Sequence, residues 1–241
     1  RDQPRSRGLG DVYKRQTQMG VEYLNDDSAA ADAEIIAMIV QVMQKAGLKE
    51  FQISIGQVEY FKSLVEEARL SEDAVIELRQ MISIKNHFGA EELLEKMHLR
   101  KDLQNALGNL SQMFGGPEVL GIAKALTRNP KALAAVKRLE DIYRILQLYG
   151  LEQYVVFDFG MLSKFRYYTG IIFQAYTYGN GEALVTGGRY DHLLEHFSKK
   201  APAIGFTIVM DQLMNALDRQ DIKLPVRNTK TMILYCLLYT S

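Results

Sequence analysis

The first part of the chain combines two strand-like segments with a strongly amphipathic helix. Residues 17–24 have a strand-like pattern, and residues 51–55 alternate apolar and polar side chains, which predicts a second strand. Between them, apolar residues recur at helical spacing and predict a helix over about residues 30–46. Its apolar stripe consists of Ile35, Ile36, Ile39, Val40 and Met43. Residues 26–28 and Gly47 have the side chains that begin and end such a helix.

The middle of the chain is predicted to be helical almost throughout. A helix is expected over residues 57–68 and another from Ser71 to about residue 85, with helical segments continuing to residue 150. Gly116-Pro117 and Asn129-Pro130 each place a proline where a helix begins. Residues 61–150 are therefore expected to form a helical insertion packed beside a sheet.

From residue 151 the pattern changes to the two-residue period of β-strands. Strands are expected over residues 154–158, 167–178, 182–186 and 203–209, and a helix over residues 211–218. The sequence Gly179-Asn180-Gly181 predicts a hairpin turn. Because the sheet is drawn from residues 17–60 and 151–220, the fold class is α+β, with antiparallel hairpins instead of repeating βαβ units.

The composition is that of a globular protein. Of the 241 residues, 47% are hydrophobic and 24% charged, which excludes collagen-like, coiled-coil and largely disordered classes. The 29 basic and 29 acidic residues give zero net charge, whereas nucleic-acid-binding proteins usually have a basic surplus. Cys236 is the single cysteine, so a disulfide-stapled secreted scaffold is excluded. No segment approaches the ~18 apolar residues of a membrane span, and a cytoplasmic location is expected.

The two ends differ from the rest of the chain. Residues 1–16 are polar and aperiodic, so a non-native or disordered end is expected, with a genuine basic arm as the competing interpretation. Residues 221–241 are expected to be a linker and the start of a truncated C-terminal region, with a strand beginning at residues 231–239. These features predict a fragment that is truncated at its N-terminus.

Most motifs with a known chemistry are absent or incomplete. His192, Glu195 and His196 match a zinc-protease pattern, but no glutamate follows to act as a further ligand, so two exposed histidines on a short helix are expected and no metal. The chain has no Gly-Lys-Ser/Thr phosphate loop and no Gly-x-Ser-x-Gly nucleophile turn.

Three pairs of residues are candidates for a ligand-binding site. Gln18 and Glu22 are four residues apart on one strand, hence on the same face and about 13 Å apart along the backbone. Tyr167 and Tyr168 are expected to open a strand, with their hydroxyls on opposite faces. Gly187 and Gly188 would allow a ligand to approach the backbone closely. Taken singly, each pair is also explained by ordinary sheet packing or a tight turn.

The order of four motifs gives a clearer indication. Residues 18–22 (QMGVE), 167–170 (YYTG), 187–191 (GGRYD) and 203–206 (AIGF) occur in the order and spacing of one family. Over about residues 17–220 the chain resembles the catalytic core of histidyl-tRNA synthetases, and its helical middle lies where that family carries an insertion. The resemblance implies a class II aminoacyl-tRNA synthetase-like antiparallel sheet with flanking helices.

Two positions depart from the synthetase pattern. Ser163 stands where the family carries a catalytic arginine, and Gln212 stands where a second arginine contacts ATP phosphate. Neutral side chains cannot stabilise phosphate charge as arginines do. Residues 160–164 and 167–173 resemble those of ATP phosphoribosyltransferase regulatory subunits, which share the synthetase core without its chemistry.

The resemblance implies a non-catalytic, cofactor-free regulatory subunit acting at the first step of histidine biosynthesis. It implies that L-histidine is bound by Gln18, Glu22, Tyr167 and Tyr168, in a pocket lined by Thr169, Gly187, Gly188 and Arg189. The expected partners are a short-form catalytic subunit of ATP phosphoribosyltransferase, which it activates, and further copies of this core, with neither membrane nor tRNA. A divergent histidyl-tRNA synthetase and a stand-alone small-molecule sensor are the alternatives.

Overall fold

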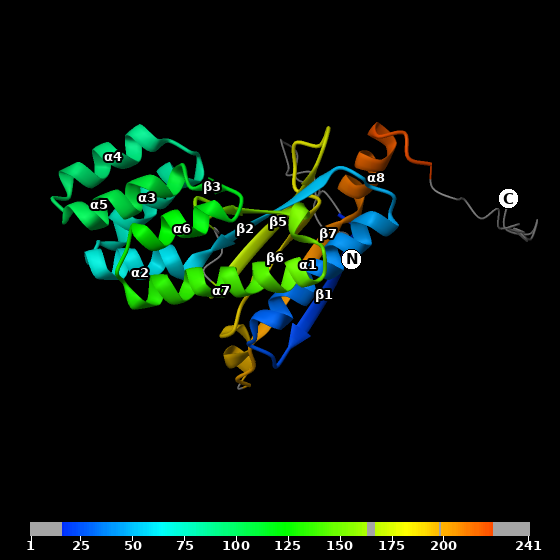
Figure 1. The fold of residues 1–241 in the computed structure, drawn as a ribbon, viewed down its shortest axis with the longest axis horizontal. Helices are drawn as coiled ribbons and strands as arrows, with labels where there is room; N and C mark the ends of the chain where they lie inside the picture. The colour runs from blue at the N-terminus through cyan, green and yellow to red at the C-terminus, as the bar shows by residue number, and fades with distance from the viewer. Residues whose placement is uncertain (1–15, 163–166, 198, 224–241) are drawn as a thin grey trace, which may run out of the picture.

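A computed structural model describes residues 16–162, 167–197 and 199–223 (Figure 1). The expected ends at residues 1–15 and 224–241, including the strand at residues 231–239, lie outside these ranges, and so does Ser163.

One seven-stranded sheet runs through the described chain in the order β1-β7-β6-β5-β2-β4-β3. Neighbouring strands are antiparallel except for β2 and β4, which are parallel. The strands are β1 (Gln18–Leu24), β2 (Phe51–Gln57), β3 (Phe114–Gly115), β4 (Val155–Asp158), β5 (Ile171–Thr177), β6 (Val185–Arg189) and β7 (Ala203–Val209). The predicted α+β class is therefore confirmed.

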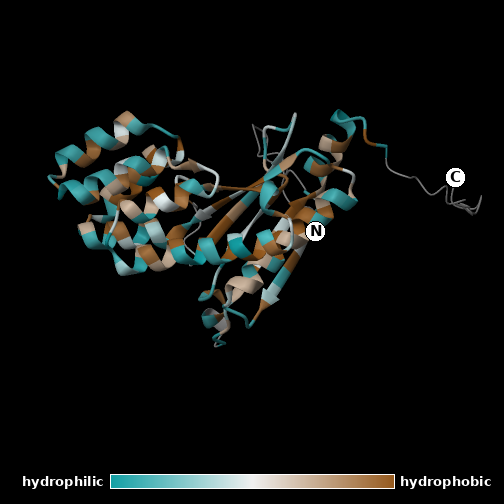
Figure 2. Ribbon diagram, viewed as in Figure 1, coloured by the Kyte–Doolittle hydropathy of each residue, from teal (hydrophilic) through white to brown (hydrophobic). Residues whose placement is uncertain are grey.

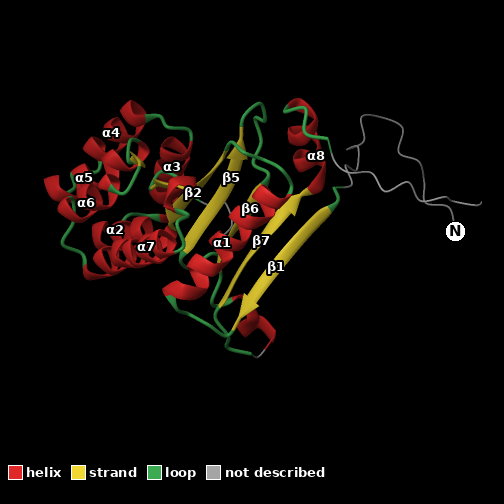
Figure 3. Cartoon of the chain, turned by 45° about the vertical axis from the view of Figure 1, so that its right-hand side comes forward, coloured by secondary structure: helices red, strands yellow, loops and turns green. Residues whose placement is uncertain are grey.

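The helices cover one face of this sheet and extend beyond one end of it. Figures 1 and 3 show α1 lying over the strands, while α2 to α6 gather at the end occupied by β3 and α7 runs from beside α2 toward α1. The helices are α1 (Ala29–Lys45), α2 (Val58–Ala68), α3 (Glu72–Ser83), α4 (His87–Lys96), α5 (Lys101–Gly108), α6 (Glu118–Ala125), α7 (Pro130–Leu148) and α8 (Met210–Arg219).

The core lies between the sheet and the long helices. Ile36 and Ile39 of α1 and Ile53 and Ile55 of β2 are all fully buried, and hydrophobic residues follow the strands in Figure 2. Ile35, Ile36, Ile39, Val40 and Met43 are buried together, so the predicted apolar stripe of α1 is confirmed. Burial of this stripe fixes one face of the sheet against helices and leaves the other face available for a site.

Local capping signals explain where the two long helices begin. The Ser28 hydroxyl accepts a hydrogen bond from the Ala31 N–H at the start of α1. The Asn129 side chain accepts bonds from the N–H groups of Lys131 and Ala132, and Pro130 follows as the first residue of α7.

Three local predictions need correction. Tyr167 and Tyr168 precede β5 instead of opening it, because the strand begins at Ile171. The strand expected over residues 182–186 is β6, which begins at Val185. The two-residue strand β3 lies within the span expected to be helical, where it pairs with β4.

The described ranges contain neither a cluster of metal-ligating side chains nor a helix that could span a membrane. His192 is exposed and its Nδ1 contacts Glu195 at 3.0 Å. No group of three metal-ligating side chains occurs among the described residues. None of the helices in these ranges is long and apolar enough to cross a membrane.

Candidate functional site

A cavity of about 920 Å³ lies on the sheet face opposite α1 and α7. Gln52 and Ser54 of β2 line it and alternate with the buried core residues Ile53 and Ile55, so the two faces of this strand have different roles. Its lining comes from β1, β7, β6, β5, β2 and β4, and from the loop that carries Tyr167 and Tyr168. A cavity of this size is at the upper end of the range for small-molecule sites.

Glycines form the floor at the β1 end of the cavity. Strand pairing places Glu22 beside Gly205, Gly205 beside Gly188, and Gly188 beside Ile172. A Cβ at Gly205 would lie 2.6 Å from Cδ of Glu22, and one at Gly188 would lie 2.7 Å from Cε1 of Tyr168. Because neither position tolerates a side chain, the carboxylate of Glu22 and the ring of Tyr168 can lie directly against the sheet.

Three tyrosine rings gather beside this floor. The ring centroids of Tyr167 and Tyr168 are 4.4 Å apart, and Tyr190 approaches them edge-on at 6.1 and 6.5 Å. All three line the cavity, so the expectation that the first two point to opposite faces is wrong. They lie on a turn before β5, where the alternation of a strand does not apply.

Tyr190 was not singled out by the sequence, although it belongs to the motif at residues 187–191. Its position after two glycines was the available signal.

The environment alters the acidity of two cavity groups. Burial raises the pKa of Tyr168, and a hydrogen bond with Tyr167 and the negative charge of Glu22 raise it further. Tyr168 therefore remains a neutral hydroxyl at physiological pH. Partial burial also raises the pKa of Glu22, because the carboxylate has lost part of its hydration. A cationic ligand group that pairs with this partly buried carboxylate would stabilise its charged form.

Gln18 does not join the cavity in the described structure. It lies on the same face of β1 as Glu22 but pairs with Val209 at the other end of the strand. Its side chain is exposed and its amide contacts Gln16 at 3.5 Å. The structure thus brings Glu22, Tyr167, Tyr168 and Gly187 to the cavity. Gln18 lies outside its lining, and so does Gly188, which the ring of Tyr168 covers.

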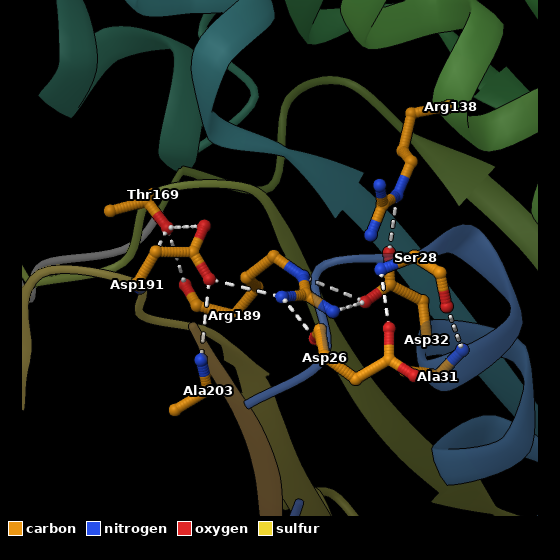
Figure 4. Close-up of polar contacts among 9 residues, drawn as sticks. All are labelled: Asp26, Ser28, Ala31, Asp32, Arg138, Thr169, Arg189, Asp191 and Ala203. Atoms are coloured by element: carbon orange, nitrogen blue, oxygen red, sulfur yellow. Dashed lines mark hydrogen bonds and ion pairs between the residues drawn. The ribbon is translucent and has the colours of Figure 1, made fainter. Parts of the chain in front are cut away.

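Arg189 points to the helical side of the sheet instead of the cavity, which corrects the expectation that it lines the pocket. Its Nε and Nη2 donate to Oδ1 of Asp32 at 2.8 and 2.6 Å, and Nε of Arg138 donates to Oδ2 of the same carboxylate at 2.6 Å (Figure 4). Asp32 is fully buried. One carboxylate of α1 thereby joins β6 to α7.

Thr169 is also engaged away from the cavity lining. Its hydroxyl donates to Oδ2 of Asp191 at 2.9 Å and accepts from the Asp191 N–H at 3.1 Å. Asp191 in turn accepts a bond from Nη1 of Arg189 at 3.0 Å. Because Thr169 directly follows Tyr168, this network (Figure 4) holds the backbone from which the tyrosine ring projects.

The far half of the cavity contains polar residues that the sequence did not indicate. Nζ of Lys85, from the helical middle of the chain, lies 2.6 Å from Oδ1 of Asp158 on β4. The Ser54 hydroxyl is buried and has no hydrogen-bond partner among the described residues. Such a group costs about 1–3 kcal/mol when it is left unpaired. The sequence around Lys85 does not indicate a site, because Lys85 comes close to the sheet only in the folded chain.

Gln212, which the resemblance led us to expect at one of the two synthetase arginine positions, lies in the first turn of α8. Its amide nitrogen contacts the carboxylate of Glu182. Neither side chain of this contact carries a positive charge.

Comparison with known proteins gives a consistent family. Residues 5–213 match the family model described as histidyl-tRNA synthetase. An ATP phosphoribosyltransferase regulatory subunit from Acetivibrio thermocellus is 39% identical over 226 residues, which are 94% of this chain and 54% of that protein. A regulatory subunit from Thermoanaerobacter pseudethanolicus is also 39% identical, over 91% of this chain and 58% of its own length.

The solved structures agree with the sequence relatives. A crystal structure from Bacillus halodurans, described as an ATP phosphoribosyltransferase regulatory subunit/histidyl-tRNA synthetase, has a TM-score of 0.78 and 35% identity over 83% of this chain and 53% of its own. A chain of the Thermotoga maritima ATP phosphoribosyl transferase complex has a TM-score of 0.65 at 19% identity, over 84% of this chain and 69% of its own, and shows the same fold.

The chain spans about half the length of the curated relatives it matches. Within that span, the family model and the solved structures agree on a class II synthetase-like sheet flanked by helices. The curated relatives that match it over more than 90% of its length include ATP phosphoribosyltransferase regulatory subunits, and the chain belongs to the histidyl-tRNA synthetase family.

Proposed function

We propose that this chain is the histidine-binding part of a non-catalytic regulatory subunit of ATP phosphoribosyltransferase. The observation that carries the proposal is 39% identity over 94% of the chain to a regulatory subunit. The cavity beside Glu22 and the three tyrosines supports it, because it offers a carboxylate and neutral hydroxyls to a small polar ligand.

Histidine matches the chemistry of the β1 end of the cavity. The Glu22 carboxylate would accept an imidazole N–H, and a tyrosine hydroxyl would meet the other ring nitrogen. Gly205 and Gly188 let the Glu22 carboxylate and the Tyr168 ring lie directly against the sheet, so that both border the space proposed for the imidazole. In this proposal Gln18 receives the amino-acid end of histidine by a movement of its exposed side chain, since it lies outside the cavity lining.

The proposal assigns no chemistry to this chain. Adenylate formation requires positive charge at the phosphates, and the family positions for it hold Ser163 and Gln212. The functional output would instead be a change in the activity of a short-form catalytic subunit. Histidine feedback and activation then depend on coupling between the two subunits, which is reciprocal for their binding free energies.

Self-association through the synthetase-like core is part of the same proposal. Among the described residues β1 lies at one edge of the sheet, and Met19 and Leu24 on it are 45% and 51% exposed. In this proposal those apolar side chains face a second copy of the core. Light scattering of the full-length protein tests this, and a monomer at all concentrations would contradict it.

Two measurements test the function. Calorimetric titration of L-histidine into the full-length protein should show binding. If histidine binds neither the protein alone nor its complex with the catalytic subunit, the assignment of histidine as the ligand is wrong. Histidine-dependent ATP–pyrophosphate exchange should be absent, and clear exchange would identify a synthetase instead. Co-purification with a short-form catalytic subunit separates the proposal from a stand-alone sensor.

A further inference from the structure

A continuous chain of polar contacts connects α7, on the helical side of the sheet, to the loop that carries the cavity tyrosines (Figure 4). It begins at Arg138 of α7, whose Nε donates to Oδ2 of Asp32 at 2.6 Å. Oδ1 of Asp32 accepts from Nε and Nη2 of Arg189 on β6, at 2.8 and 2.6 Å. Because each side chain comes from a different element, these contacts tie α7, α1 and β6 together.

The second part of the chain leads from Arg189 to the tyrosines. Nη1 of Arg189 donates to Oδ1 of Asp191 at 3.0 Å, and Oδ2 of Asp191 accepts from the Thr169 hydroxyl at 2.9 Å. The backbone repeats the link, since the Thr169 N–H donates to the Arg189 carbonyl at 2.8 Å. Thr169 directly follows Tyr168, which lines the large cavity. Asp32 is therefore connected to the Tyr168 backbone through hydrogen-bonded residues.

Burial makes this chain sensitive to the loss of one member. Asp32 is 0% and Arg189 4% exposed, so bulk water cannot replace a lost partner. Each oxygen of the Asp32 carboxylate serves one arginine. A buried carboxylate oxygen that loses its cationic partner is strongly unfavourable. Without Arg138, the carboxylate would turn toward another donor and its geometry with Arg189 would change.

A second cavity, of about 440 Å³, gives this chain room to rearrange. It lies on the helical side of the sheet, and Asp32, Arg138, Arg189 and Thr169 all line it. Nη2 of Arg138 is buried and has no hydrogen-bond partner among the described residues. Closely packed interiors resist small shifts of side chains, whereas groups that border a cavity can change position. A movement of α7 therefore has space in which to displace Asp32.

α7 is also the element through which the helical middle of the chain reaches the sheet region. It packs against α2 at one end of its course and against α1 further along, as Figure 1 shows. Arg138 lies between the two ends of α7 (Pro130–Leu148). A shift of the helical middle would therefore move Arg138 relative to Asp32.

We propose that Arg138 and Asp32 are positioning residues that couple α7 to the part of the cavity at Tyr168. While their contact is intact, the chain holds the backbone before β5; when it is broken, that backbone loosens and the cavity binds its ligand less tightly. Contiguous hydrogen-bonded networks carry coupling of this kind. The effect on histidine affinity rests on the proposed function, whereas the effect on the backbone does not.

Hydrogen exchange of the ligand-free full-length protein tests the positioning. Arg138→Met keeps much of the side-chain length and removes the donor and the charge. The amides of Thr169 and Asp191 belong to the chain and should exchange about fivefold faster in this variant, the effect of one hydrogen bond. Amides in the middle of β2 and β5 should exchange as in wild type. Unchanged exchange at Thr169, or equal acceleration throughout the sheet, would overturn the positioning role.

Three further variants on α7 separate this role from a general loss of stability. Arg138 uses one donor toward Asp32, so Arg138→Lys retains the charge and a donor and should restore slow exchange. Arg138→Gln retains a donor alone and serves the same test if Arg138→Met does not fold. Arg144→Met is the matched control, because Arg144 is exposed and pairs with Asp141 at 3.2 Å. Equal exchange in the two methionine variants would contradict the proposal.

Histidine titration of these variants tests the coupling to the cavity. Arg138→Met should bind histidine roughly fivefold more weakly, while Arg138→Lys and Arg144→Met should bind as wild type does. Thr169→Val interrupts the same chain nearer the cavity. Arg138→Met should therefore weaken binding by less than about twofold in a Thr169→Val background. Effects that simply multiply would mean that the two residues act independently, which would overturn the coupling.

The two measurements keep this inference apart from the proposed function. If wild type binds no histidine while Arg138→Met accelerates exchange at Thr169, the histidine assignment is wrong and the positioning role stands. If wild type binds histidine and Arg138→Met changes neither exchange nor affinity, the positioning role is wrong and the histidine assignment stands.

Discussion

Glu22 carries the only carboxylate at the glycine end of the cavity within the described residues, and its charge state should set the pH dependence of histidine binding. Burial raises the pKa of Glu22 above its ordinary value of 4.5, so the carboxylate loses its charge as pH falls through this raised value. Free imidazole loses its charge above about pH 6.5. Affinity should therefore be highest between these two pKa values and fall on both sides, as calorimetry across pH 4.5–8 would show.

Glu22→Gln keeps the shape of the side chain and removes its charge. A charge-assisted hydrogen bond contributes about 1.5–3 kcal/mol, so histidine affinity should fall by roughly tenfold to a hundredfold. The maximum in the pH profile should also disappear. Glu34→Gln, on the exposed surface of α1, is the matched control and should leave affinity unchanged. Equal affinities for wild type and Glu22→Gln would remove Glu22 from the site.

Thr169 should act as a positioning residue for Tyr168 through its hydrogen bonds with Asp191. Thr169→Val keeps the shape but loses both bonds, and we expect about a fivefold loss of histidine affinity. Thr169→Ser retains the hydroxyl and should restore binding. Thr177→Val, at the other end of β5, removes a hydroxyl bonded to the Glu50 carbonyl and should lower stability alone. Equal effects of the two valine variants on affinity would contradict positioning.

Among the elements, α7 depends on a local cap that can be tested directly. Asn129→Ala removes the acceptor for two N–H groups, and also the bond that Nδ2 donates to Glu67 at 2.8 Å. The free energy of unfolding should fall by about 0.5–2 kcal/mol. Urea unfolding measures it, and Asn129→Ser should recover most of the loss. No change in stability would mean that packing alone holds this end of α7.

Elements with a strong local pattern could be predicted from the sequence. β7 was expected over residues 203–209 and is observed there, because these residues form a short, mostly apolar run rich in β-branched side chains that is buried along most of its length. β3 could not be predicted, since two residues carry no period and its partner β4 is about forty positions away. Arg189 was expected in the pocket because it belongs to a recognised motif. The sequence did not show which face of the sheet its side chain occupies, and in the structure it lies on the helical side, paired with the buried Asp32 of α1.

At the scale of the whole molecule, ligand binding should raise the free energy of unfolding. A ligand present at a hundred times its dissociation constant adds about 2.7 kcal/mol to the free energy of unfolding. Thermal unfolding of the full-length protein with saturating histidine should therefore shift upward, and lysine at the same concentration should not produce this shift. The shift should be smaller in Glu22→Gln. Equal shifts with both amino acids would indicate a nonspecific effect.

The parallel pairing of β2 and β4 has a consequence for how the protein folds. Apart from the two residues of β3, the chain lies outside the sheet between Gln57 and Val155, where it pairs beside Ile53 of β2. Joining these strands closes a loop over the whole helical middle, and each doubling of such a loop adds only about 0.6 kcal/mol of closure entropy. The length of that middle can therefore change at little thermodynamic cost. Its closure is nevertheless slow, so the strands on the two sides of it should come together only late in folding.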